Sequence, residues 1–195
     1  MTTKTTDNWT FSAGWLGAAR RVASPNFNPR PAGSHPELIV VHGISLPPKC
    51  YGGGEIEAFF CNVLHADDHP YFAEITDLRV SAHFLICRSG ELVQFVDTDS
   101  RAWHAGVSEW QGRENCNDFS IGIELEGCDD EPYAERQYAT LGTLVQALRK
   151  QYPRIQRDAI VGHSEIAPGR KTDPGPAFDW SRVAGLSANR VRNAD

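Results

Sequence analysis

The 195-residue sequence lacks the features that would place it in several large classes of protein. No stretch approaches the roughly 20 consecutive apolar residues that a membrane-spanning helix needs, so we expect no membrane partner. Basic residues are in the minority, and a formal charge of −6 gives no long-range attraction for nucleic acid. There is no internal repeat and no low-complexity block. These absences favour a globular protein of one domain, which suits the chain length.

Cysteine is present, but not in a metal-binding pattern. The five cysteines are scattered and none forms a CxxC pair, so a cysteine zinc site is not expected. The N-terminal residues contain no apolar run typical of a signal peptide. Unpaired thiols without an export signal indicate a reducing compartment, and we expect a cytoplasmic protein. Polar composition predicts loose segments at 1–12 and 187–195 around a folded domain at 13–186.

Apolar patterns along the chain alternate between those of strands and those of helices. Apolar side chains spaced by three and four residues predict the longest helix at 133–152, which Pro153 ends. A tight turn at Ser89-Gly90 predicts a hairpin within 81–97. Further strands are predicted at 37–44, 120–127 and 159–166, and short helices at 55–64 and 178–186. This order predicts an α/β fold, a single domain with a mixed central β-sheet flanked by helices.

Two histidines and an aspartate stand where a metal site is expected. His42 ends the apolar run LIVVH and His163 lies in AIVGH, and ligands of α/β sheets gather beyond the carboxyl ends of strands. Asp173 follows in a rigid loop that contains three prolines. Two imidazoles and one carboxylate, with a fourth position open to water, are an accepted ligand set for hydrolytic zinc. The spacing alone is not specific, and structural histidines would give the same pattern.

A glutamate and a lysine are candidates for the chemistry. Glu124 and Glu126 are predicted to point to the same face of a strand, and the small Gly122 beside them leaves room for a ligand. Glu124 can take a proton from water and return it to a leaving amine. Lys171 is two residues from Asp173 and can stabilise an oxyanion. The alternatives are exposed carboxylates and a solvated lysine.

Aromatic and amide side chains are concentrated in the polar segment 101–118. Trp103 and Trp110 in this setting are typical of a sugar-binding loop, although core or rim aromatics would look the same. Arg79 and Arg113 suit bidentate contact with ligand carboxylates, or else they are ordinary surface arginines.

Five segments, taken in order, together resemble the AmpD family. They are VVHGISLPP, LRVSAHFLI, RAWHAGVS, GRENCNDFSIGIELEG and GHSEIAPGRKTDPGP. The resemblance spans about residues 14 to 186, nearly the whole chain. AmpD proteins are cytoplasmic N-acetyl-anhydromuramyl-L-alanine amidases, part of the wider type 2 amidase and peptidoglycan-recognition fold.

The resemblance implies a role for each candidate residue. It makes His42, His163 and Asp173 the Zn²⁺ ligands, Glu124 the carboxylate that activates water, Lys171 the oxyanion-stabilising cation, and Arg79, Trp103 and Arg113 the residues that line the muropeptide site. The implied reaction is hydrolysis of the amide between the lactyl group of 1,6-anhydro-N-acetylmuramic acid and L-alanine during peptidoglycan recycling. The implied partner is therefore a small anhydro-muropeptide, and we expect a monomer.

The sequence departs from other members of the wider family at three positions. Phage and animal relatives usually carry Cys as the third ligand, whereas this sequence has Asp173, as the AmpD group does. The same relatives place Tyr where this sequence has Ala82. Gly43 replaces an Asn that often follows the first ligand. Two alternatives stay open at this point, a lytic amidase that acts on intact peptidoglycan and a non-catalytic muropeptide sensor.

Overall fold

The computed structural model describes residues 8–184, and the central element is a six-stranded mixed sheet. Its strand order is β12-β5-β11-β6-β7-β3. Strands β12, β5, β11 and β6 run parallel, whereas β6 and β7 form the predicted antiparallel hairpin. The bounds are β3 Arg20–Arg21, β5 Leu38–Ile44, β6 Phe84–Ile86, β7 Leu92–Gln94, β11 Ser120–Glu126 and β12 Ile160–Gly162. The predicted α/β fold with a mixed central sheet is confirmed.

Short paired strands lie around this sheet. They are β1 Phe11–Ser12 with β2 Trp15–Leu16, β4 Phe27–Pro29 with β8 Ser100–Ala102, and β9 Glu109–Trp110 with β10 Arg113–Glu114. The predicted loose ends, 1–12 and 187–195, lie mostly outside the described residues. No helix within 8–184 is long and apolar enough to cross a bilayer.

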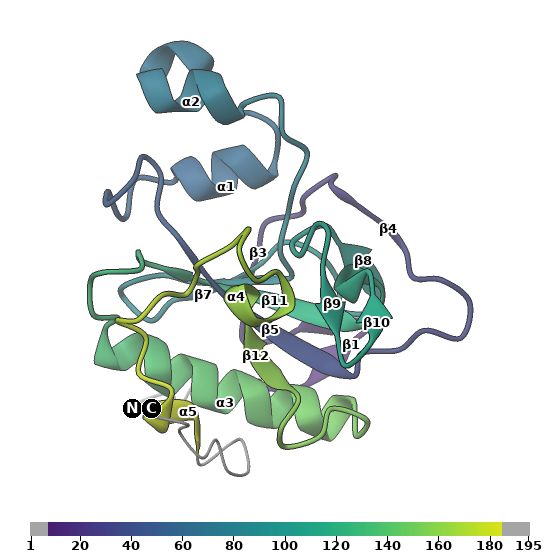
Figure 1. Ribbon diagram of the computed structural model, residues 1–195. Helices are drawn as coiled ribbons and strands as arrows, with labels where there is room; N and C mark the ends of the chain where they lie inside the picture. The colour runs from purple at the N-terminus through teal and green to yellow at the C-terminus, as the bar shows by residue number, and fades with distance from the viewer. Residues whose placement is uncertain (1–7, 185–195) are drawn as a thin grey trace, which may run out of the picture.

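One long helix covers one face of the sheet. Helix α3, Glu135–Gln151, matches the predicted helix and buries one apolar stripe (Figure 1). Leu141, Leu144 and Leu148 on this stripe are fully buried in the main core. The Gln137 amide also donates to the carbonyls of Ile86 and Glu126, which ties the helix to the ends of two strands.

The other side of the sheet carries only short helices. Helices α1, Glu55–Phe60, and α2, Pro70–Ile75, are joined through the 3-10 turn η1, Ala66–Asp68, and stand away from the sheet in Figure 1. They pack through a second apolar cluster that includes Phe59, Phe60 and Phe72. The predicted helix at 55–64 stops early because Asn62 adopts a left-handed backbone with φ 61°.

The strand predicted at 159–166 is wrong in its second half. Strand β12 ends at Gly162, and His163 begins the short helix α4, His163–Ile166. The Glu165 carboxylate accepts a hydrogen bond from the Gly162 N–H at 2.8 Å and so caps the helix start. Helix α5, Ser181–Ala184, lies inside the predicted range 178–186, whose last two residues are outside the described part.

Candidate metal centre

Strand register brings the candidate residues together. In the parallel pair β11–β5, Glu124 is the partner of His42, so a carboxyl and an imidazole stand side by side on adjacent strands. On the other side of β5, Gly162 pairs with Val41, which places His163 at the end of β12 next to His42. The Ser164 N–H donates to the Asp173 carbonyl at 3.0 Å and fastens the proline-rich loop to helix α4.

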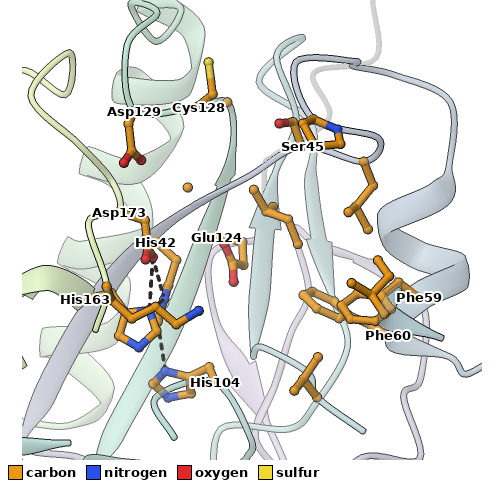
Figure 2. Close-up of a pocket in the computed structure, with 18 of the residues that line it drawn as sticks. His42, Ser45, Phe59, Phe60, His104, Glu124, Cys128, Asp129, His163 and Asp173 are labelled. Carbon is orange, nitrogen blue, oxygen red and sulfur yellow. Dashed lines mark hydrogen bonds and ion pairs between the residues drawn. The ribbon is translucent and has the colours of Figure 1, made fainter. Parts of the chain in front are cut away.

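Three ligand atoms converge at this point (Figure 2). The Nδ1 atoms of His42 and His163 are 2.9 Å apart, and each is 3.1 Å from Asp173 Oδ2. A tetrahedral zinc ion with bonds of about 2.05 Å separates its ligand atoms by about 3.3 Å. The three atoms therefore fit one face of such a tetrahedron after small adjustments, and the fourth corner stays open. These residues form a candidate metal site.

The electrostatics of this group suit a cation. Burial lowers the pKa of His42 to about 4 despite its hydrogen bond to Asp173, so the imidazole is neutral at pH 7. Burial opposes ionisation of Asp173, but its close contacts with His163 and His42 outweigh it and hold the pKa of Asp173 well below its usual range. A neutral imidazole and an ionised carboxylate are the protonation states in which these groups bind a divalent ion.

Glu124 is a buried acid beside the candidate site. Its side chain is 8% exposed, and its Oε2 atom has no hydrogen-bond partner among the described residues. Burial raises the pKa of Glu124 well above its usual value; the Asp173 charge adds to this shift and Lys171 opposes it. A carboxyl with raised proton affinity and a free oxygen is suited to proton transfer.

A cavity of about 520 Å³ opens in front of these groups. Its lining includes His42, His163 and Asp173 on one side, with Glu124 between them and the phenyl rings of Phe59 and Phe60 (Figure 2). Further apolar lining comes from α2 and the residues that follow it, namely Tyr71, Ile75, Leu78 and Val80. One wall is thus polar and reactive, and the opposite wall is apolar.

The structure brings most of the predicted site residues to this cavity, but not all. Lys171 and Trp103 both line it, and the Trp103 indole N–H donates to Asn28. Arg79 does not line it, and its guanidinium donates to nearby backbone carbonyls. Arg113 is engaged elsewhere, where it pairs with Glu37 at 2.5 Å and lies over the Phe119 ring.

Two glycines make room for side chains of the protein itself. The space beside Gly122, predicted to receive a ligand, is filled by the His104 ring, which a Cβ at Gly122 would overlap. A Cβ at Gly43 would overlap the Tyr133 hydroxyl, and that hydroxyl donates to the Pro174 carbonyl at 3.0 Å. His104 was missed as a site residue; the signal for it was an unassigned histidine inside RAWHAGVS.

The fold and the donor set define a metal-dependent hydrolase, because two imidazoles and a carboxylate face an open corner beside a buried acid. Residues 32–176 match the model of the N-acetylmuramoyl-L-alanine amidase family, and the chain belongs to that family. The resemblance noted in the five sequence segments is thereby confirmed.

The chain is similar over most of its length to characterised members. It is 58% identical over 175 residues to the 1,6-anhydro-N-acetylmuramyl-L-alanine amidase AmpD of Salmonella typhimurium (strain SL1344), which covers 90% of this chain and 93% of the relative. A crystal structure of a Se-Met AmpD derivative superposes with a TM-score of 0.88 at 55% identity and covers 91% of this chain and 98% of that one. AmpDH3 from Pseudomonas aeruginosa, solved in complex with anhydromuramic pentapeptide, gives a TM-score of 0.60 at 29% identity and covers 77% of this chain and 59% of that one.

Proposed function

We propose that the chain hydrolyses the amide between the lactyl group and L-alanine in 1,6-anhydro-N-acetylmuramyl peptides, with zinc as the metal. The observation that carries this proposal is the triangle of His42 Nδ1, His163 Nδ1 and Asp173 Oδ2 at the floor of the cavity. The similarity to the AmpD of Salmonella typhimurium, whose name states this activity, supports the choice of substrate.

The chain's own side chains account for the proton movements of the reaction. When bound, zinc supplies a Lewis acid and lowers the pKa of water toward about 7. Glu124 takes the proton from the attacking water and delivers it to the nitrogen of L-alanine as the carbon–nitrogen bond breaks. The Lys171 ammonium lies in the same lining and stabilises the negative charge on the carbonyl oxygen. The products are a lactyl carboxylate on the anhydro sugar and a free peptide amine.

The polar wall and the apolar wall of the cavity suit a substrate that has both polar groups and apolar carbon atoms. Trp103 offers a ring for the sugar face, and the apolar wall near Leu78 suits methyl and ring carbons. Arg79 and Arg113 stay predictions as substrate contacts, because neither lines the cavity in this structure. A monomeric enzyme of the cytoplasm completes the proposal, as the AmpD resemblance implies.

Product analysis with and without a chelator tests the proposal. A defined anhydro-muropeptide should give two products whose masses add up to the mass of the substrate plus one water, and a chelator should abolish the reaction. Added zinc should restore it, at close to one zinc per chain by elemental analysis. Activity that persists in metal-free protein would overturn the mechanism, and faster cleavage of intact sacculi than of the anhydro-muropeptide would overturn the substrate.

A further inference from the structure

Both candidate histidine ligands contact the same short segment of the chain. Each imidazole turns Nδ1 toward the site, so each turns Nε2 away from it. His42 Nε2 lies 2.9 Å from His104 Nδ1, and His163 Nε2 lies 3.1 Å from the Ala105 carbonyl oxygen. Two consecutive residues therefore meet the outer nitrogens of both ligands, although those ligands are 121 residues apart in sequence. We call this pair the His104–Ala105 bracket.

The hydrogen-bond polarity of the bracket is consistent with metal binding through Nδ1. A neutral imidazole that uses Nδ1 as a ligand carries its hydrogen on Nε2 and must donate it. The Ala105 carbonyl can only accept, which favours this tautomer for His163. His104 Nδ1 accepts from His42, and His104 Nε2 then donates to Ser120 Oγ at 3.1 Å. The ring of His104 fits against β11 only because Gly122 has no side chain.

The bracket is itself held by side chains from two other parts of the chain. It lies beyond the end of β8, so its backbone has no strand partner there. The buried Asn117 Oδ1 atom accepts from the N–H of His104 at 3.1 Å and from the N–H of Ala105 at 2.8 Å. On the other side, the Arg170 guanidinium donates to the Ala105 carbonyl at 2.6 Å and to the Val107 carbonyl at 2.7 Å.

We propose that Asn117 is a positioning residue of the metal centre, which acts by fixing the His104–Ala105 bracket and thereby the orientation of both ligand imidazoles. One amide oxygen can accept two N–H groups, and it restrains two consecutive residues at once. The inference rests on the proposed metal centre. Removing hydrogen-bond partners of ligand imidazoles elsewhere weakens metal affinity by about 10- to 100-fold, and we expect an effect in this range.

The test compares variants of Asn117 that differ in the acceptor. Asn117→Leu keeps the approximate size of the side chain but removes the oxygen, whereas Asn117→Asp keeps an oxygen in the same place. We expect zinc affinity, measured by competition with a chromophoric chelator, to fall about 10- to 100-fold in the Leu variant and to be largely retained in the Asp variant. The visible spectrum of the cobalt(II)-substituted protein should shift in the Leu variant, because its bands report the ligand geometry.

A second pair of variants covers the case in which Asn117→Leu does not fold. His104→Leu removes the acceptor for His42 Nε2, and His104→Asn restores an acceptor near the same position. Zinc affinity should fall in the first variant and recover in the second. These two variants test whether the His104–Ala105 bracket orients the ligand imidazoles without any substitution at Asn117.

Asn26→Leu is the matched control. The Asn26 amide is also buried and also holds backbone carbonyls, those of Phe60 and Val80, but it does not contact the ligands. This variant should lose thermal stability and keep the zinc affinity and cobalt spectrum of the wild type. A wild-type protein that binds no zinc would end the metal proposal itself. Wild-type affinity and spectrum in a folded Asn117→Leu or His104→Leu protein would overturn the bracket alone.

Discussion

The two faces of the central sheet are covered in very different ways. The closed face, under α3, is covered by a helix of 17 residues with a continuous apolar stripe. The hollow face, under α1 and α2, has two helices of six residues each, which stand away from the strands (Figure 1). A long helix fills the space above a sheet, whereas short helices leave part of it open. The cavity with the candidate metal centre lies on the hollow face, opposite the long helix that covers the main core.

The largest effect should follow a change of the acid on the hollow face. Glu124→Gln removes the proton carrier but preserves the volume of the side chain, so kcat should fall by about 10²- to 10⁴-fold. Zinc content and thermal stability should stay close to wild type, because Glu124 is not one of the three ligand residues. Turnover of anhydro-muropeptide and elemental analysis measure the two quantities. A variant that works at the wild-type rate would remove Glu124 from the chemistry.

A core substitution on the closed face should act on stability alone. Leu141 on α3 is fully buried, and Leu141→Ala leaves a cavity in the main core. The free energy of unfolding should fall by about 2–5 kcal/mol, measured by urea denaturation. KM should remain unchanged in the folded fraction. A large rise in KM would mean that the two faces are coupled and that the comparison fails.

Acid should destabilise the protein through a histidine buried below the hollow face. Burial lowers the pKa of His83 to about 3, with a further contribution from the Arg30 charge. The unfolded chain takes up this proton near pH 6.5, whereas the folded chain does not until about pH 3. Stability from this group is therefore complete above pH 6.5 and decreases as the pH falls toward 3, by about 2 kcal/mol at pH 5.

His83→Asn isolates this contribution. An Asn at this position keeps an acceptor for the Gly122 N–H, which His83 Nδ1 binds at 3.0 Å. Urea unfolding at pH 7 and pH 5 should show a smaller pH dependence in the variant, by about 2 kcal/mol. An identical pH dependence in both proteins would show that His83 is not the responsible group.

The smallest effect is expected at the apolar wall of the hollow face. Leu78 is 49% exposed and lines the cavity, so Leu78→Ala should change stability by no more than about 0.5 kcal/mol. The variant should lose about 1 kcal/mol of the free energy of substrate binding, because the apolar contact with Leu78 is reduced, and KM should therefore rise about fivefold. Val63→Ala is the control, since Val63 is 59% exposed in the same segment but does not line the cavity. Equal KM values in the two variants would exclude this wall from substrate binding.

The sequence was sufficient for the elements and side chains whose signal is local. Strands β5 and β11 and helix α3 follow from short apolar patterns, and His42 and Asp173 follow from their position at a strand end and in a proline-rich loop. The start of α4 at His163 was missed because the apolar run that ends at Val161 made the whole segment 159–166 fit a strand, although the capping Glu165 lies within it. Local patterns do not distinguish these two outcomes.

Other features could not be predicted because they depend on contacts between distant segments. Gly122 indicated open space, but only the fold shows that the His104 ring fills it. The sequence also gives no reason to connect Asn117 with His42 and His163, which lie in other elements of the fold. Arg113 was equally plausible as a ligand contact until its pairing with Glu37 was visible.

The parallel pairing of His42 with Glu124 has a consequence for how such a chain can change over evolution. A one-residue insertion in either strand would turn every later side chain of that strand to the opposite face, and the candidate metal ligand and the acid would no longer be neighbours. The connection between β5 and β6 contains no strand and contacts the sheet through side chains, so a change in its length shifts no strand register. We therefore expect length variation to concentrate between residues 45 and 80, where it would reshape substrate preference and leave the reactive centre intact.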